Sequence, residues 1–354
     1  MSKTKGENSR SGRLAAHLLS FLEAKREAIP EMLILTHDYP DPDALAAAFA
    51  LQHLLAQGYE IKSRIAYGGV VGRQENRAMV ELLELPAYKL RATDFERYEH
   101  VALVDTQPRF ENNPFPASER KPTLIVDQHK PVSSPDAELA LIDTGCGASC
   151  VIVARALLIK GIEIPKPVAT ALAYGILSDT QDLYRANRRD VVNTYLEIIH
   201  NCDMHILAKI RNPVRKRGFF SGVGRTIEGA SAYRGLLVSH LGEVHNPDLV
   251  AQMADFLLTY ENSRWAFCTG RYDGRLYLSL RSDRGRTDAG EVLRSVVDNP
   301  RDAGGHGTVG GGSFALPEEA DEEAWKEAET RVQARLAKRL RIPARGEFRN
   351  PFKR

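Results

Sequence analysis

Short apolar runs alternate with amphipathic helix patterns along the first half of the chain. The run MLILTH, residues 32–37, ends in polar residues, as a buried parallel strand does. Helix patterns lie on either side of it, at residues 12–28 and from Asp43 onward. The further expected elements are strands 60–66, 100–105 and 122–127 and helices 74–84, 148–160 and 167–177. This alternation predicts an α/β fold with an open, mainly parallel sheet and helices on both faces.

The pattern changes near residue 186, where helical segments rich in Arg and Asn begin and are interrupted by Pro213. We interpret residues 186–225 as a helical linker that joins a first domain, residues 1–185, to a smaller α/β domain, residues 226–354. The elements expected in the second domain are strands near 231–240, 264–272 and 275–281 and helices near 248–260, 288–297 and 318–341, the last of them C-terminal.

Length, apolar content, net charge and cysteine content limit the classes of protein to which the chain can belong. The chain has 354 residues, which is enough for two domains of ordinary size. No apolar run approaches the roughly 20 residues that span a bilayer, so we expect no membrane partner and a cytoplasmic location. The net charge is only +2, so long duplex nucleic acid is not an expected partner. The four cysteines form no CxxC pair, which favours reduced thiols over a zinc site.

Acidic and imidazole side chains follow the apolar runs of the first domain. In open α/β sheets, ligands bind at the carboxyl ends of the strands. One or two such acids are commonly turn formers or helix caps, but four separate groups favour a common site. Clustered carboxylates repel one another unless cations neutralise them, and carboxylates with imidazoles suit Mn²⁺ or Mg²⁺. The candidates are His37, Asp41, Asp43, Asp105, Asp127, His129 and Asp179.

Five motifs resemble those of a known family. In chain order, HDYPDPDALAAAFAL, VDTQ, VDQHK and SDTQ resemble the four motifs of the DHH phosphoesterase family. The segment AGGHGTVGGGSF resembles the glycine-rich motif of the DHH-associated C-terminal domain. The resemblance covers roughly residues 30–315, and its first motif, His-x-x-x-Asp-x-Asp after a strand, is the most specific. It implies a hydrolase that acts on phosphoester bonds.

The resemblance also implies a role for each residue of a two-metal centre. His37 and Asp41 correspond to ligands of the first ion, and Asp43 and Asp179 to ligands of the second. Asp105 corresponds to the carboxylate that bridges both ions and is therefore catalytic. Two ions about 3.5–4 Å apart can clamp a phosphoryl group and supply a metal-bound hydroxide as nucleophile. We expect Mn²⁺, with Mg²⁺ as the alternative.

The third motif departs from the family pattern. The family has Asp-His-His, whereas this chain has Asp127, Gln128 and His129. The imidazole missing at Gln128 is a ligand of the second ion in the family, and a carboxamide oxygen is a weaker ligand. We therefore expect Gln128 to ligate weakly and the second metal site to be weakened. His129 corresponds to the residue that contacts the scissile phosphate, and Asp127 to a catalytic residue that orients the ligands.

Four residues of the second domain are candidates for substrate binding. Gly305 and His306 lie in the glycine-rich motif, where a backbone without side chains can approach a phosphate closely. The structural alternative is a flexible loop before a strand. Arg281 and Ser282 end the apolar run RLYLSLRS and resemble the substrate-binding segment of the family. An Arg there is often a surface charge, but it is also the preferred phosphate ligand.

The expected function is hydrolysis of phosphodiester bonds in very short oligonucleotides, as in the nanoRNase branch of the family. Alternatives that stay open are a 3′-phosphoadenosine 5′-phosphate phosphatase, a cyclic-dinucleotide phosphodiesterase and an exopolyphosphatase. From another class, Gln128 favours a nucleotide-binding sensor with impaired catalysis. The expected partner is a short oligonucleotide or a nucleotide phosphate. A homodimer is an open alternative to a monomer.

Overall fold

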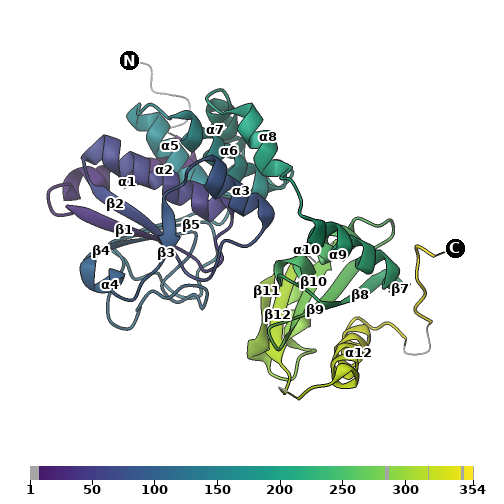
Figure 1. The fold of residues 1–354 in the computed structure, drawn as a ribbon. Helices are drawn as coiled ribbons and strands as arrows, with labels where there is room; N and C mark the ends of the chain where they lie inside the picture. Colours follow the sequence, from purple (N-terminus) through teal and green to yellow (C-terminus); the bar gives the residue numbers. More distant parts are fainter. Residues whose placement is uncertain (1–7, 284–286, 318, 344–346, 354) are drawn as a thin grey trace. The chain divides into compact units, whose positions relative to one another are not determined.

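The computed structural model describes residues 8–283, 287–317, 319–343 and 347–353. The chain divides into two compact units, Met1–Val214 and Arg215–Arg354 (Figure 1).

A six-stranded parallel sheet forms the centre of the first unit. Its order is β3-β2-β1-β4-β5-β6, and every neighbouring pair is parallel. From β1 the chain adds β2 and β3 on one side of the sheet, and from β4 it adds β5 and β6 on the other side. The strand order therefore reverses between β1 and β4, and open α/β sheets bind ligands at such a topological switch point. The predicted open parallel sheet is confirmed. The strands are β1 (Glu31–Thr36), β2 (Lys62–Tyr67), β3 (Ala87–Lys89), β4 (His100–Val104), β5 (Leu124–Asp127) and β6 (Leu139–Ile142).

The helical cover of this sheet is concentrated on one face, where α2 packs against α5 and α6. Gly175 of α6 allows a close approach, because a Cβ there would lie 2.8 Å from the Cβ of Ala46 in α2. The other face is covered by the one-turn α4 and by loops that contribute Tyr98 and Phe115. Among the described residues, no helix has both the length and the apolar character needed to cross a membrane. The helices are α1 (Arg10–Lys25), α2 (Pro42–Tyr59), α3 (Gln74–Leu82), α4 (Asp94–Arg97), α5 (Cys150–Lys160), α6 (Lys166–Thr180), α7 (Arg189–Ile199) and α8 (Met204–Arg211).

The second unit is a smaller α/β fold, as predicted. Its sheet has the order β11-β12-β10-β9-β8-β7, in which only the pair β8 and β9 is parallel among the described strands. Helices α9 and α10 pack on one face, and α11 and α12 on the other. Its elements are α9 (Arg217–Glu228), β7 (Ser231–Tyr233), β8 (Leu236–Glu243), α10 (Asp248–Leu258), β9 (Trp265–Tyr272), β10 (Arg275–Ser282), α11 (Ala289–Arg294), the 3₁₀ turn Pro300–Asp302, β11 (Ala303–His306), β12 (Val309–Ala315) and α12 (Glu322–Arg339).

The stretch interpreted as a linker, residues 186–225, is divided between the two units. Helices α7 and α8 bury Ile198 and Ile210 in the core of the first unit. Helix α9 packs Phe219 and Val223 against the core of the second. The division between the units falls after Val214.

An ion network ties α1 to the start of α7. Arg188 donates to Asp143 at 2.7 and 2.8 Å and to Asp190 at 2.5 and 3.0 Å. Asp190 also accepts hydrogen bonds from the backbone N–H and the hydroxyl of Ser11, at 3.2 and 2.8 Å. Burial opposes the charged form of Asp190, but the hydrogen bonds from Arg188 and Ser11 prevail and hold its pKa well below the ordinary value.

We expect Asp190→Asn to destabilise the protein at neutral pH by about 1–2 kcal/mol, because hydrogen bonds to a charged group are lost. The folded-state pKa of Asp190 lies below its unfolded value, so its ionised form stabilises the fold above about pH 4. That contribution is lost as the pH falls through the folded-state pKa. Urea unfolding at pH 7 and pH 3 should therefore show a smaller difference between wild type and variant at pH 3. A difference that grows toward acid pH would contradict this role of Asp190.

Candidate metal centre

His37 and Asp41 are positioned by the turn between β1 and α2. Strand β1 ends at Thr36, and Asp41 caps α2 by accepting a hydrogen bond from the backbone N–H of Ala44 at 3.0 Å. The Nδ1 of His37 lies 2.7 Å from the carbonyl oxygen of Asp38, which can only accept, so Nδ1 carries the proton. Nε2 therefore faces the centre, in the orientation of a metal-ligating histidine. Burial lowers the pKa of His37, but without a metal its contacts with Asp105 and Asp41 outweigh burial and raise the pKa well above the ordinary value.

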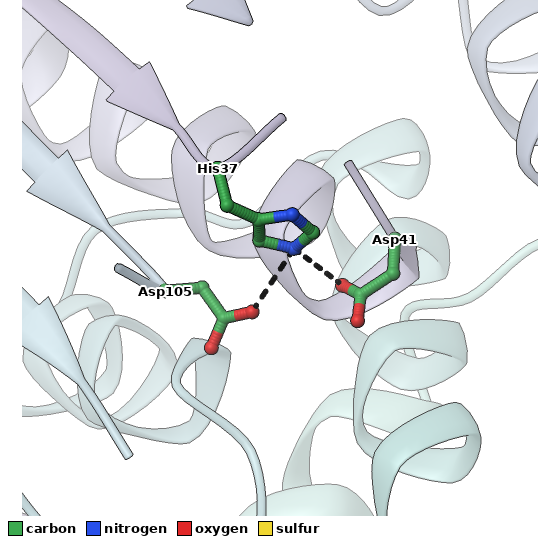
Figure 2. A group of neighbouring side chains, drawn as sticks. All are labelled: His37, Asp41 and Asp105. Carbon is green, nitrogen blue, oxygen red and sulfur yellow. Dashed lines mark ion pairs between the residues drawn. The ribbon is translucent and has the colours of Figure 1, made fainter. Parts of the chain in front are cut away.

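Asp105 follows β4 directly and so reaches the same edge of the sheet. Figure 2 shows the Nε2 of His37 between the carboxylates of Asp105 and Asp41, at 3.5 Å from Asp105 Oδ2 and 3.8 Å from Asp41 Oδ1. The backbone of Asp105 is left-handed, with a φ of 58°. Aspartate adopts this conformation more readily than most residues other than glycine.

One oxygen of Asp105 lacks a hydrogen-bond partner. The residue is 1% exposed, and its Oδ1 accepts a hydrogen bond from the Ser149 hydroxyl at 2.7 Å. Its Oδ2 accepts none within the described part of the chain. An unsatisfied buried carboxylate oxygen is costly unless a cation binds it. Ligand atoms of His37, Asp41 and Asp105 lie within 4.8 Å of one another, and this set of two carboxylates and one imidazole fits a divalent metal ion.

Negative charge is concentrated around this set. Burial, reinforced by the charge of Asp105, raises the pKa of Asp43 well above its ordinary value. Burial and the charges of Asp41 and Asp43 raise the pKa of Asp179 in the same way. Carboxylates that resist ionisation together are stabilised by a bound cation. The electrostatics therefore agree with the metal-binding geometry.

Asp127 holds His129 beside the centre. Asp127 is the last residue of β5 and is fully buried. It accepts hydrogen bonds from His129 Nδ1 at 2.9 Å, from the backbone N–H groups of Gln128 and His129 at 2.7 and 3.1 Å, and from Gln107 Nε2 at 2.6 Å. Burial lowers the pKa of His129, but Asp127 and the charge of Asp105 outweigh it and raise the pKa to about 9. His129 is thus cationic at neutral pH, with Asp127 orienting its ring.

The remaining predicted ligands have protein partners. Gln128 donates through Nε2 to Oδ2 of Asp179 at 2.7 Å. The carboxylate of Asp43 accepts the backbone N–H groups of Ser149 and Cys150 at 2.5 and 2.9 Å. The structure therefore brings two sets of possible ligands together, His37 with Asp41 and Asp105, and Asp105 with Asp127 and His129. The metal roles of all the predicted ligands, including Asp43, Gln128 and Asp179, stay predictions.

The candidate substrate residues lie in the second unit. Arg281 is 5% exposed, and its guanidinium donates to Asp255 at 2.5 Å and to the carbonyl of Gly310 at 3.3 Å. Ser282 is also buried, and Gly305 lies in β11. The substrate role predicted for His306 concerns a side chain that lies outside the described residues. Arg281 thus has a structural partner, and the substrate roles stay predictions.

Two residues of the centre were not singled out from the sequence. Ser149 precedes α5 and would ordinarily be interpreted as a helix cap, but its hydroxyl donates to Asp105 instead. Gln107 belongs to the VDTQ motif, two residues after Asp105, and donates to Asp127 and to the carbonyl oxygen of His129. The position of Gln107 in the VDTQ motif could have indicated that it belongs to the site. The contact of Ser149 with Asp105, in contrast, can be identified only from the folded structure.

Residues 31–176 match the family described as "DHH family, N-terminal domain". These residues form a DHH-family N-terminal domain. The resemblance of the first three motifs is thereby confirmed, and the DHH domain contains the whole turn that carries His37, Asp41 and Asp43, together with Asp105.

Relatives of this DHH protein differ in length. An uncharacterized protein from Methanocaldococcus jannaschii is 30% identical over 297 residues, which are 83% of this chain and 60% of the relative. A probable manganese-dependent inorganic pyrophosphatase from Streptococcus pyogenes is 26% identical over 152 residues, or 42% of this chain and 48% of the relative. The chain thus spans about half to three fifths of the length of these curated relatives.

A solved structure shares the fold over nearly the whole chain. The exopolyphosphatase-related protein from Bacteroides fragilis superimposes with a TM-score of 0.72 at 14% identity, and the match covers 93% of this chain and 98% of that one. At 14% identity, this structural similarity shows only that the two proteins share the folds of both units.

Proposed function

We propose that this DHH protein is a metal-dependent phosphoesterase that hydrolyses phosphodiester bonds in very short oligonucleotides. The observation that carries the proposal is the convergence of His37, Asp41 and the unsatisfied Asp105 Oδ2 at the switch point of the sheet. The site combines metal ligands with a cationic imidazole on His129, and this combination suits an anionic phosphoester. Mn²⁺ is the proposed ion, in keeping with the manganese dependence ascribed to the pyrophosphatase relative.

In this proposal the residues of the centre have three separate roles, which are to bind the metal, to bind the phosphate and to position His129. His37, Asp41 and Asp105 would hold the ion, and a bound divalent ion would supply Lewis-acid stabilisation of charge on the phosphoryl group. His129, kept protonated by Asp127, would donate a charge-assisted hydrogen bond to a phosphate oxygen. Asp127 is then a positioning residue whose loss would allow the ring to rotate.

The second unit supports a nucleotide phosphate as substrate. A Cβ added at Gly304 in β11 or Gly311 in β12 would meet nothing within 4 Å, so the backbone there is open to close approach. Because glycine has no side chain, a phosphate could approach this part of the backbone closely. The choice of very short oligonucleotides rests on this feature and on the motif resemblance.

Turnover on a panel of substrates tests the proposal. Purified full-length protein with Mn²⁺ would be assayed on the dinucleotide pApA, on 3′-phosphoadenosine 5′-phosphate, on a cyclic dinucleotide, on pyrophosphate and on polyphosphate. We expect the highest kcat/KM on pApA. A higher kcat/KM on any other substrate would replace the proposed one, and tight nucleotide binding without turnover would identify a sensor.

A further inference from the structure

We propose that Gln128 and the amino end of α5 take the place of a second metal ion, so that the centre binds a single divalent ion tightly. The inference rests on the proposed metal role of His37, Asp41 and Asp105, and it concerns two further acids beside the centre, the buried Asp43 and the partly exposed Asp179.

Asp179 is held by a protein donor. It lies in the last turn of α6, and its Oδ2 accepts the hydrogen bond from Gln128 Nε2 at 2.7 Å. The amide nitrogen of Gln128 is the donor in this contact, so it faces Asp179 and the amide oxygen is turned away. The backbone of Gln128 is itself fixed, because its N–H donates to Asp127 Oδ1 at 2.7 Å. Gln128 therefore presents a donor to this space, where a metal site needs an acceptor.

Asp43 accepts hydrogen bonds from backbone N–H groups at the start of α5. Its Oδ2 accepts the N–H of Ser149 and its Oδ1 that of Cys150, and the side chain is fully buried. The first N–H groups of an α-helix have no partner within the helix, and the helix dipole favours a negative charge beside them. Both oxygens of Asp43 thus already have partial positive charges as partners.

Asp105 differs from Asp43 and Asp179 in its hydrogen bonds. Asp105 keeps one buried oxygen without a hydrogen bond, and that oxygen faces His37. Within the described residues, no group of three ligand atoms lying within 4.8 Å of one another includes Asp43 or Asp179. Asp43 and Asp179 therefore accept hydrogen bonds from N–H donors of the protein, whereas Asp105 Oδ2 accepts none within the described residues and is open to an ion.

Mn²⁺ binding to metal-stripped full-length protein tests this inference without reference to turnover. Calorimetry and electron paramagnetic resonance would measure the number of ions bound and any magnetic coupling between them. We expect wild type to bind one Mn²⁺ at least about ten-fold more tightly than any other, with an uncoupled spectrum. We expect Gln128→His, which exchanges the amide donor for an imidazole lone pair, to bind two ions and to show coupling.

The matched control is Gln52→His. Gln52 lies in α2 of the same unit and donates to the carbonyl of Ser63 at 3.0 Å, so it undergoes the same chemical change away from the centre. This variant should bind one ion like wild type. Two equally tight ions in wild type would overturn the inference, whatever the fold of Gln128→His, and so would one ion in a folded Gln128→His. No tight ion in wild type would instead overturn the proposed metal-dependent function.

Discussion

Asp105→Asn is expected to lower the turnover of phosphodiester substrate by about 1,000-fold or more while leaving the fold intact. Asparagine tolerates the left-handed backbone at this position, where φ is 58°. Its side-chain oxygen can still accept the hydrogen bond from Ser149. The amide group would, however, replace the unsatisfied carboxylate oxygen that faces His37, so the anionic metal ligand is lost.

Asp273→Asn is the matched control for this variant. Asp273 is also left-handed, with a φ of 47°, but it lies between β9 and β10 in the second unit. Turnover of pApA and Mn²⁺ affinity would be measured for both variants, with circular dichroism to confirm folding. We expect Asp273→Asn to behave like wild type. Normal Mn²⁺ affinity and normal turnover in Asp105→Asn would remove Asp105 from the metal centre.

Asp43→Ala is expected to destabilise the first unit by about 2–4 kcal/mol, because it leaves two N–H groups at the start of α5 buried without an acceptor. Relief of the repulsion between Asp43 and Asp105 offsets part of that loss. Asp43→Asn keeps one acceptor oxygen and should cost about half as much. Urea unfolding in the presence of a chelator would measure these losses without any contribution from a metal.

The control for Asp43 is an exposed helix cap. Asp321 accepts a hydrogen bond from Ala324 N–H at 2.8 Å at the start of α12, and Asp321→Ala should cost only about 1 kcal/mol. If Asp43→Ala destabilised the protein only when Mn²⁺ is present, Asp43 would act as a metal ligand. The capping role that the structure gives it would then be wrong.

Much of the first unit could be predicted from the sequence, because its buried strands are continuous apolar runs with polar ends. The run MLILTH gave β1 to within one residue at each end and placed His37 at the edge of the sheet. Strands β3 and β6 were not predicted, since three and four residues at the two edges of the sheet give too short a pattern. The parallel sheet follows from the longer strands, whereas its strand order and switch point are known only from the structure.

The partners within the centre could not be predicted in the same way. The motif gave Gln128 as an altered ligand, but whether its amide oxygen or nitrogen faces Asp179 depends on how β5 and α6 meet in space. Asp43 accepts a hydrogen bond from Ser149 at the start of α5, 106 positions further along the chain. A local sequence pattern cannot predict a contact over such a separation. Arg281 ends its strand as expected, but its pairing with Asp255 depends on the packing of α10 on β10. Tertiary contacts decide each of these roles.

Hydrolysis of pApA by the metal-stripped 354-residue protein during titration with Mn²⁺ tests whether the protein is a metal-dependent phosphodiesterase. We expect background turnover with chelator present, and activity that rises with Mn²⁺ along the same curve as the occupancy of one tight site. We also expect Asp105→Asn to stay at background over the whole titration. Equal turnover of pApA in chelator and in Mn²⁺, or intact pApA at saturating Mn²⁺, would contradict this function.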